Sequence, residues 1–272
     1  MAINYAEKYS SKIDERFKIG AVTTPAINND YDFVGVKTVK VYSVPTAPMG
    51  DYERSGLSRY GTPEELENSV QEMTLTRDRS FTFTIDRGNY NDTMMVNAAG
   101  QALQRQIDEV VIPELDIYRL SIMAAQAGKT ATAAITADNA YEAFLDAGVA
   151  LTNNKVPVSG RVAYVAPSFY KNIKLDQSFI KASDIAQNML LKGQIGQVDG
   201  VPLIMVPESY LPENVSFMVT NKIATVAPVK LAEYKTHDNP PGINGWLVEG
   251  RLYYDAFVLE NKKAAIYVHK NA

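Results

Sequence analysis

The residue types that most often carry enzyme chemistry are sparse in this sequence. The 272 residues include two histidines, His237 and His269, and no cysteine. Without cysteine the chain has no disulfide, no thiolate metal ligand and no cysteine nucleophile. The histidines belong to no H-E-x-x-H pattern, so a metal site would have to be built from carboxylates alone, and we predict no metal and no cofactor. The stretch NNDYDF, residues 28–33, has suitable oxygens, but its composition is that of a turn.

Two glycine-containing stretches invite comparison with phosphate-binding loops. AGKTAT, residues 127–132, ends like such a loop, but Met123 stands where the motif requires its first glycine. We therefore expect Gly128 to cap the C-terminus of a helix. KGQIGQVDG, residues 192–200, lacks the G-x-G-x-x-G spacing, and its Asp-Gly pair predicts a hairpin turn at Asp199 and Gly200.

Two carboxylates near the C-terminus leave one catalytic alternative open. Glycoside hydrolysis needs only a pair of acids, and Glu249 and Asp255 are candidates for such a pair. Their even separation along a strand is equally that of an ordinary polar stripe. A carboxylate-only hydrolase therefore stays as an alternative, and the prediction is that the protein is not an enzyme.

Composition and charge restrict the class of protein further. Hydrophobic residues make up 46% of the chain and charged residues 21%, which is typical of a globular protein with a substantial core. The formal net charge of -4 supplies no positive excess with which to gather nucleic acid. No apolar run approaches the roughly 20 residues of a membrane span, and we expect neither a signal peptide nor a membrane anchor.

The first long elements that the pattern predicts are two extended strands. Residues 33–44 are rich in Val and Tyr, and residues 73–86 alternate apolar and polar side chains with a period of two. Residues 45–72 between them are polar and punctuated by Gly and Pro. We therefore predict a long two-stranded β-ribbon over residues 33–86, which would need another surface to lie against.

A long helix and a mixed half follow the ribbon. Apolar side chains at helical spacing predict a helix from Asp92 to about Ala127, bent or split near Gly100 or Pro113. Beyond Gly128 the pattern alternates between helix and strand. The last two strands are predicted to form a closing hairpin with a polar turn at residues 261–263.

This order of elements, an N-terminal arm, a ribbon, a long helix with a proline, a mixed α+β half and terminal strands, resembles that of the major capsid proteins of tailed phages, the Hong Kong 97-like fold. Two stretches carry the resemblance locally. VVIPELDIYRLS, residues 110–121, is similar to the late part of the spine helix of that family. VEGRLYYDAFVLENKKAAIYV, residues 248–268, is similar to its C-terminal stretch.

The resemblance implies an α+β fold with five segments. These are an N-terminal arm, an extended β-ribbon loop that overlaps the adjacent subunit, a spine helix with part of a peripheral domain, an axial domain, and C-terminal strands that complete the peripheral domain. Their expected ranges are residues 1–32, 33–86, 87–136, 137–222 and 223–272.

The implied function is assembly. A chain of this family would form the hexamers and pentamers of an icosahedral shell around packaged double-stranded DNA of a tailed phage or prophage. Its partners would be other copies of itself, a portal, a separate scaffolding protein and DNA bound without sequence specificity, with no membrane. It would be assembled in the cytoplasm of the bacterial host and reside in the virion capsid. An encapsulin-type nanocompartment shell with a protein cargo shares the fold and is the main alternative.

Two sets of residues are expected to matter in such an assembly. The first would place the ribbon on its neighbour through basic and apolar side chains: Arg54, Arg59, Arg77, Arg79, Phe81, Phe83 and Ile85. The second belongs to the two similar stretches and is structural: Pro113, Glu114, Asp116, Glu249, Gly250, Arg251 and Asp255. Glycine at position 250, inside a strand, predicts a bulge or a close approach of another group.

Some members of the family crosslink their shells through isopeptide bonds between a lysine of the extended loop and an asparagine of a neighbour. Here no lysine occurs between Val41 and Gly128. Lys37 and Lys40 lie on the first predicted strand, near the base of the ribbon. We therefore predict a shell held without covalent crosslinks.

Overall fold

The computed structural model describes residues 21–31, 33, 37–63, 65–66, 68–88, 98–181 and 196–272. The chain divides into two compact units, which are described separately: residues 33–75 form one, and Met1–Asp32 with Thr76–Ala272 form the other. The predicted N-terminal arm lies largely outside the described residues. Its described part contains a short 3-10 helix η1 (Thr24–Ala26) and strand β1 (Ile27–Asn28).

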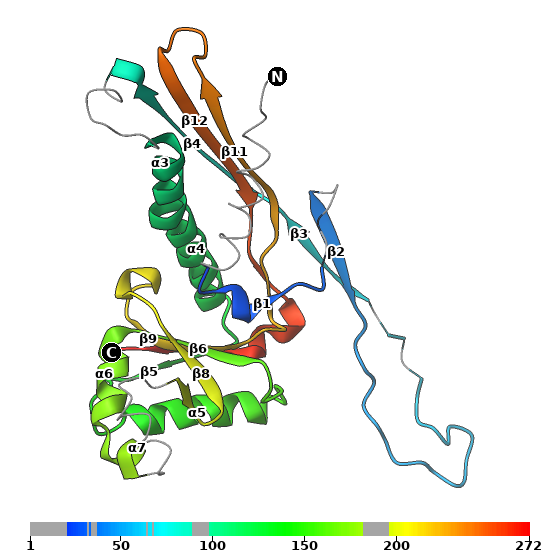
Figure 1. Ribbon diagram of the computed structural model, residues 1–272. Helices are drawn as coiled ribbons and strands as arrows, with labels where there is room; N and C mark the ends of the chain where they lie inside the picture. The colour runs from blue at the N-terminus through cyan, green and yellow to red at the C-terminus, as the bar shows by residue number, and fades with distance from the viewer. Residues whose placement is uncertain are drawn as a thin grey trace. The chain divides into compact units, whose positions relative to one another are not determined.

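An antiparallel three-stranded sheet forms one half of the larger unit. Its strands are β11 (Val229–Asp238), β12 (Gly245–Tyr254) and β4 (Arg77–Asp86), in that spatial order. Apolar side chains on one face of this sheet pack with the long helix into a core cluster that contains Tyr234 and Val248. Figure 1 shows the helix beside the three strands.

The predicted long helix is present as three consecutive segments. They are α3 (Ala98–Gln106), a π-helical turn η2 (Ile107–Val111) and α4 (Ile112–Ala125). Pro113 lies in the first turn of α4, where its missing N–H is tolerated best. The wider π turn directly before it lets the helix continue past the proline.

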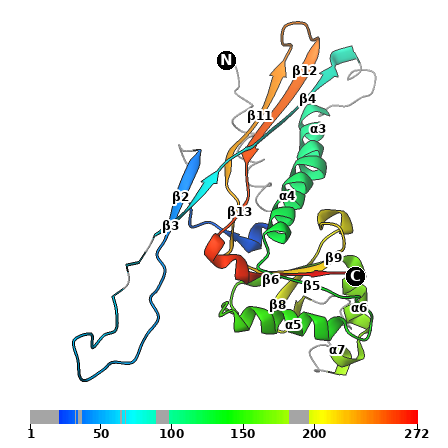
Figure 2. The ribbon, with the colours of Figure 1, turned by 180° about the vertical axis from the view of Figure 1, so that it is seen from behind.

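The long helix links two cores. Ile107, Val111 and Leu115 pack under the three-stranded sheet, whereas Leu120 and Met123, further along, belong to a second and larger cluster. This second cluster lies around a six-stranded sheet with α5 and α6, which Figure 2 shows together.

The six-stranded sheet has the order β5-β14-β9-β6-β8-β7, and it mixes parallel and antiparallel pairs. Its strands are β5 (Lys129–Thr132), β6 (Arg161–Val165), β7 (Gln197–Val198), β8 (Val201–Met205), β9 (Val215–Asn221) and β14 (Ile266–Lys270). Its helices are α5 (Ala140–Asn153), α6 (Pro167–Leu175) and α7 (Gln177–Lys181). The predicted turn between β7 and β8 is confirmed, because Asp199 and Gly200 both have positive φ angles, 49° and 75°.

Short elements join these parts. A small three-stranded sheet has the order β1-β10-β13, with β10 (Thr225–Val226) and β13 (Phe257–Val258). Two further 3-10 helices are η3 (Glu208–Tyr210) and η4 (Glu260–Ala265).

The smaller unit is a two-stranded ribbon with a long loop. Strand β2 (Thr38–Ser43) pairs with β3 (Ser69–Thr74) in antiparallel register, and Lys40 bonds to Glu72 across the pair at 2.6 Å. The described loop residues between the two strands form no helix or strand.

Two predictions about strand pairing are wrong. Residues 73–86 are not one strand of the ribbon, because β3 ends at Thr74 and the ten residues Arg77–Asp86 pair with β12 as β4. The terminal strands do not form a hairpin either: β12 joins the three-stranded sheet, η4 replaces the expected turn, and β14 joins the six-stranded sheet. In both cases the period-two pattern located the strands, and contacts with sequence-distant partners decided the pairing.

Candidate functional site

The candidate catalytic carboxylates do not form a pair. Glu249 lies on the exposed face of the three-stranded sheet, and its Oε2 is 3.1 Å from Nε2 of His237. Asp255 is buried beyond the end of β12 and is used entirely as a hydrogen-bond acceptor. The geometry therefore gives no support to the carboxylate-only hydrolase.

The phosphate-loop and metal candidates also find structural explanations. Gly128 donates its N–H to the carbonyl of Lys263, and a Cβ at this position would lie 2.5 Å from that carbonyl group. The glycine thus permits a close approach of two chain segments, and the predicted helix cap is wrong because α4 has already ended at Ala125.

Within the described residues no group of three or more His, Asp or Glu side chains is placed to hold a metal. The described helices include none with the length and apolar character of a membrane span.

Asp255 organises the junction where the larger unit resumes after the ribbon. Its Oδ2 accepts hydrogen bonds from the N–H of Thr76 at 2.8 Å and from the Thr76 hydroxyl at 2.9 Å. Its Oδ1 accepts from the Tyr118 hydroxyl at 2.6 Å and from the N–H of Ala256 at 2.9 Å. Four donors offset the cost of burying this carboxylate and connect the start of β4, the long helix and the end of β12 to one side chain.

Asp116 performs a related task for the N-terminal segment. Its carboxylate accepts from the N–H groups of Val22 and Thr23, at 3.1 and 3.3 Å, and from the Thr23 hydroxyl at 2.6 Å. Arg119, one turn later, donates to the Thr23 hydroxyl and to the Ala227 carbonyl. Burial raises the pKa of Asp116 and lowers that of Arg119 to about 10. The cluster fixes residues 22–23 on the long helix.

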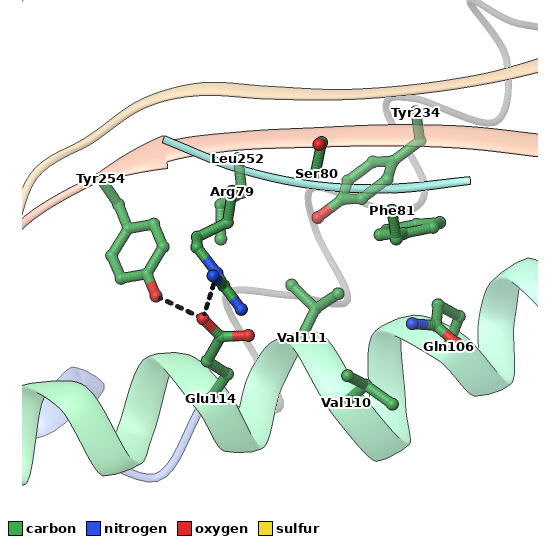
Figure 3. Close-up of a pocket in the computed structure, with 10 residues that line it drawn as sticks. All are labelled: Arg79, Ser80, Phe81, Gln106, Val110, Val111, Glu114, Tyr234, Leu252 and Tyr254. Atoms are coloured by element: carbon green, nitrogen blue, oxygen red, sulfur yellow. Dashed lines mark hydrogen bonds and ion pairs between the residues drawn. The ribbon is translucent and has the colours of Figure 1, made fainter. Parts of the chain in front are cut away.

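Glu114 forms ion pairs with Arg77 and Arg79, the two arginines at the start of β4. Its Oε1 lies 2.9 Å from Nε of Arg79 and 3.5 Å from an Nη of Arg77, and the Tyr254 hydroxyl donates to the same oxygen at 3.3 Å. The Arg77 guanidinium also stacks 4.2 Å from the centre of the Tyr118 ring. Figure 3 shows Glu114 facing Arg79 and Tyr254 beside a cavity. Both arginines thus have an acidic partner within their own chain, and the contact predicted for them with a neighbouring subunit stays a prediction.

The apolar face of β4 is likewise used within the chain. Phe81 and Phe83 are half-buried against the cluster under the three-stranded sheet, and Ile85 is half-buried opposite Trp246. These three side chains pack within their own chain because β4 belongs to this sheet and not to the ribbon, and the contact predicted for them with a neighbouring subunit stays a prediction.

Gly250 confirms the expected close approach. It lies between Phe81 and Tyr234 in the register of the three strands, and these two rings meet across it with centroids 6.0 Å apart. A Cβ on residue 250 would lie 2.3 Å from the Phe81 ring and 2.9 Å from the Tyr234 ring. On the other face, Arg251 forms a bidentate ion pair with Asp78 at 2.9 and 2.6 Å.

The loop of the smaller unit presents apolar side chains to solvent. Met49, Leu57 and Tyr60 are 101%, 106% and 92% exposed, and Tyr42 and Val44 are also exposed. Arg54 and Arg59 lie in the same loop, and both are exposed. Single exposed apolar residues are ordinary, but several on one loop make that loop a candidate interaction surface.

Comparison with known proteins identifies the family. A sequence model described as phage capsid protein matches residues 69–268. The chain belongs to this phage capsid protein family. Its sequence has no match among curated proteins.

Solved capsid structures share the fold of this capsid protein. The capsid of the Cyanophage P-SCSP1u matches with a TM-score of 0.72 and 12% identity, over 88% of this chain and 84% of that chain. The Mycobacterium phage Che8 structure matches with a TM-score of 0.67 and 17% identity, over 92% and 90% of the two chains. A virus-like particle from Pyrococcus furiosus matches at 0.59 and 12%, over 98% and 100%.

These matches confirm the predicted Hong Kong 97-like fold and the prediction of a major capsid protein. A capsid protein is a structural protein, and the encapsulin alternative is not favoured. The residues that sequence reasoning missed are the hydrogen-bond partners Thr23, Thr76, Tyr118 and Arg119. For Tyr118 and Arg119 the one signal was their position in residues 110–121, the stretch similar to the family's spine helix. That stretch does not show which distant residues they bind.

Proposed function

We propose that this capsid protein builds the hexamers and pentamers of an icosahedral shell that encloses packaged double-stranded DNA of a tailed phage or prophage. The observation that supports the proposal most directly is the exposed loop of the smaller unit. Its apolar side chains, Met49, Leu57 and Tyr60 above all, belong to neither core cluster of the chain. A second copy of the chain is the surface that would cover them.

Assembly of this kind depends on many modest contacts. Each copy would bind several neighbours, and closure of the shell would make the contacts collectively stable. Burial of the loop's apolar side chains would contribute at about 25 cal/mol per Å² removed from water. The exposed Arg54 and Arg59 would add salt-sensitive contacts to acidic groups of the neighbour.

The domain assignment follows the family with one revision. We propose residues 1–32 as the N-terminal arm, residues 33–75 as the extended loop, and residues 137–222 as most of the axial domain. The end of the loop moves from residue 86 to 75 because β4 pairs with β12. The spine helix and the three-stranded sheet would form the peripheral domain.

The remaining partners are proposed on the same basis. They are a portal, a separate scaffolding protein and DNA contacted without sequence specificity, as the net charge of -4 suggests. Assembly would take place in the host cytoplasm, and the protein would have no enzymatic activity.

The test is direct observation of particles. We expect the purified wild-type protein, or its coexpression with the neighbouring phage genes, to give closed shells in electron microscopy. Replacing residues 46–66 with a short glycine-serine turn should leave a folded protein by circular dichroism, because neither core cluster contains a residue of this range. Shells of normal shape from this variant would refute the proposed role of the loop. Extraction of a protein cargo instead of DNA from native particles would contradict the proposed content.

A further inference from the structure

A cavity of about 140 Å³ lies between the three-stranded sheet and the long helix of the larger unit. Its apolar lining includes Phe81 and Leu252 from the sheet and Val110 and Val111 from the helix, as Figure 3 shows. Glu114 and Arg79 line one end, where they are paired with each other. Ser80, Gln106, Tyr234 and Tyr254 complete the lining, and its two charged side chains already have each other as partners.

The π-helical turn contributes Val110 and Val111 to the lining of this cavity. Residues 107–111 are wound more widely than an α-helix, so Ile107 and Val111 point into the core while Val110 stays 46% exposed. Single π turns inside helices are frequent at functional sites. An apolar cavity with an exposed valine beside it forfeits dispersion contacts that an inserted side chain would restore.

A matching side chain is presented by the loop of the smaller unit. Leu57 is fully exposed within a turn that is held by hydrogen bonds from the N–H of Glu53 to the Arg59 carbonyl, at 3.1 Å, and from Nε of Arg59 to the Gly56 carbonyl, at 3.3 Å. The rings of Tyr52 and Tyr60 meet edge-on beside the turn, 5.0 Å apart. The leucine is therefore preorganised, which lowers the entropy cost of binding.

Size and charge both fit. A cavity of about 150 Å³ holds a benzene molecule, so 140 Å³ accommodates the four carbons of a leucine side chain. Arg54 and Arg59 flank Leu57 in the sequence, and Asp108 and Glu109 directly precede Val110. Glu109 is bonded to Arg105 in an exposed i,i+4 pair, which is weak enough to exchange for a partner arginine.

We propose that Leu57 of one copy inserts into the cavity between η2 and the three-stranded sheet of another copy. The inference rests on the proposed assembly function and names the receiving surface for the loop. Arg54 and Arg59 then lie against the acidic residues beside Val110.

The absence of cysteine from the sequence makes a crosslinking test clean. Shells of the Leu57→Cys and Val110→Cys double variant are assembled with reductant, then oxidised with oxidised glutathione, and run on a non-reducing denaturing gel. A disulfide requires Cα atoms about 4.4–6.8 Å apart, so it reports this contact alone. The matched control is Leu57→Cys with Thr82→Cys, because Thr82 is exposed on the opposite face of β4 from Phe81 and Phe83.

The proposal predicts a ladder of disulfide-linked chains for the double variant and monomers for the control and for each single variant. A disulfide formed within one chain, or normal shells without crosslinks, would overturn it while leaving the assembly function intact. Failure of the wild-type protein to form any shell would instead contradict the proposed function. A second pair, Arg54→Cys with Glu109→Cys, repeats the test at the flank of the contact if the first pair assembles poorly. As an independent measure, Leu57→Ala should raise the protein concentration needed for shell formation about tenfold.

Discussion

At the scale of single residues, Gly250 is the position where the fold tolerates least change. The Phe81 and Tyr234 rings occupy the space of its missing side chain. We expect Gly250→Val to destabilise the protein by about 1–3 kcal/mol or more, because the rings or the strands must move apart. Thermal unfolding by circular dichroism measures the loss. Gly196→Ala is the control, since nothing lies within 4 Å of a Cβ there, and equal unfolding midpoints for the two variants would contradict the prediction.

His269 gives a residue-scale prediction about pH. Burial lowers the pKa of His269, its ring stacks on Phe217 with centroids 5.1 Å apart, and its Nδ1 has no hydrogen-bond partner among the described residues. The folded chain thus favours the neutral ring, whereas the unfolded chain binds a proton near pH 6.5. The stability contribution is therefore complete above about pH 6.5 and is lost as the pH falls below it, by up to about 1.4 kcal/mol per pH unit.

Urea unfolding at pH 7.5 and 5.5 tests this sign. His269→Phe keeps the stacked ring and should show a smaller loss of stability at pH 5.5 than the wild type does. His237→Gln, which removes the histidine from the exposed face of the sheet, is the control variant. Asp116 acts in the opposite direction, because burial raises the pKa of its carboxyl and protonation then favours the folded state. The quantity to compare between variant and wild type is therefore the change in the free energy of unfolding from pH 7.5 to pH 5.5. Equal changes in His269→Phe and in the wild type would refute the role of His269.

At the scale of elements, the sequence located most strands and helices but not their partners. Alternation over residues 73–86 correctly predicted extended chain, yet nothing in the pattern showed that pairing passes from β2 to β12 near Thr76. The anchor at that point, Asp255, is 179 residues away along the chain. Glu114 and Asp116 were predicted as structural residues by their place in a similar stretch, whereas their partners depend on the tertiary fold, which periodicity does not encode.

The Asp255 junction gives a prediction about the element that it anchors. Asp255→Asn places an amide donor among four donors, so we expect a loss of about 2–3 kcal/mol in the free energy of unfolding. Because Thr76 directly follows the ribbon, we also expect misshapen or incomplete shells. Asp176→Asn is the matched control: this buried carboxylate accepts from the N–H groups of Tyr141 and Ser178, far along the chain from the ribbon. Equal shell defects in the two variants would show that stability alone, and not the anchor, controls assembly.

At the scale of the whole molecule, the fold of this capsid protein separates two packed cores from an exposed loop. Both core clusters include buried side chains of the long helix, whereas the loop of the smaller unit leaves large apolar side chains exposed. Stability of the monomer and capacity for assembly are therefore carried by different parts of the chain. Changes in the loop should alter particles with little effect on folding, whereas changes in the cores should first lower the stability of the folded chain.

The last prediction concerns how such a shell is held together. An isopeptide bond needs a lysine amine that loses its proton, and no lysine occurs between Val41 and Gly128. On the ribbon, the hydrogen bond and charge of Glu72 raise the pKa of Lys40, which is the direction opposite to that required of a nucleophilic amine. We therefore expect mature particles boiled in detergent to run as a single band near the 30.0 kDa chain mass. A ladder of covalent oligomers would contradict this, and loss of that ladder in Lys37→Arg or Lys40→Arg would identify the reacting amine.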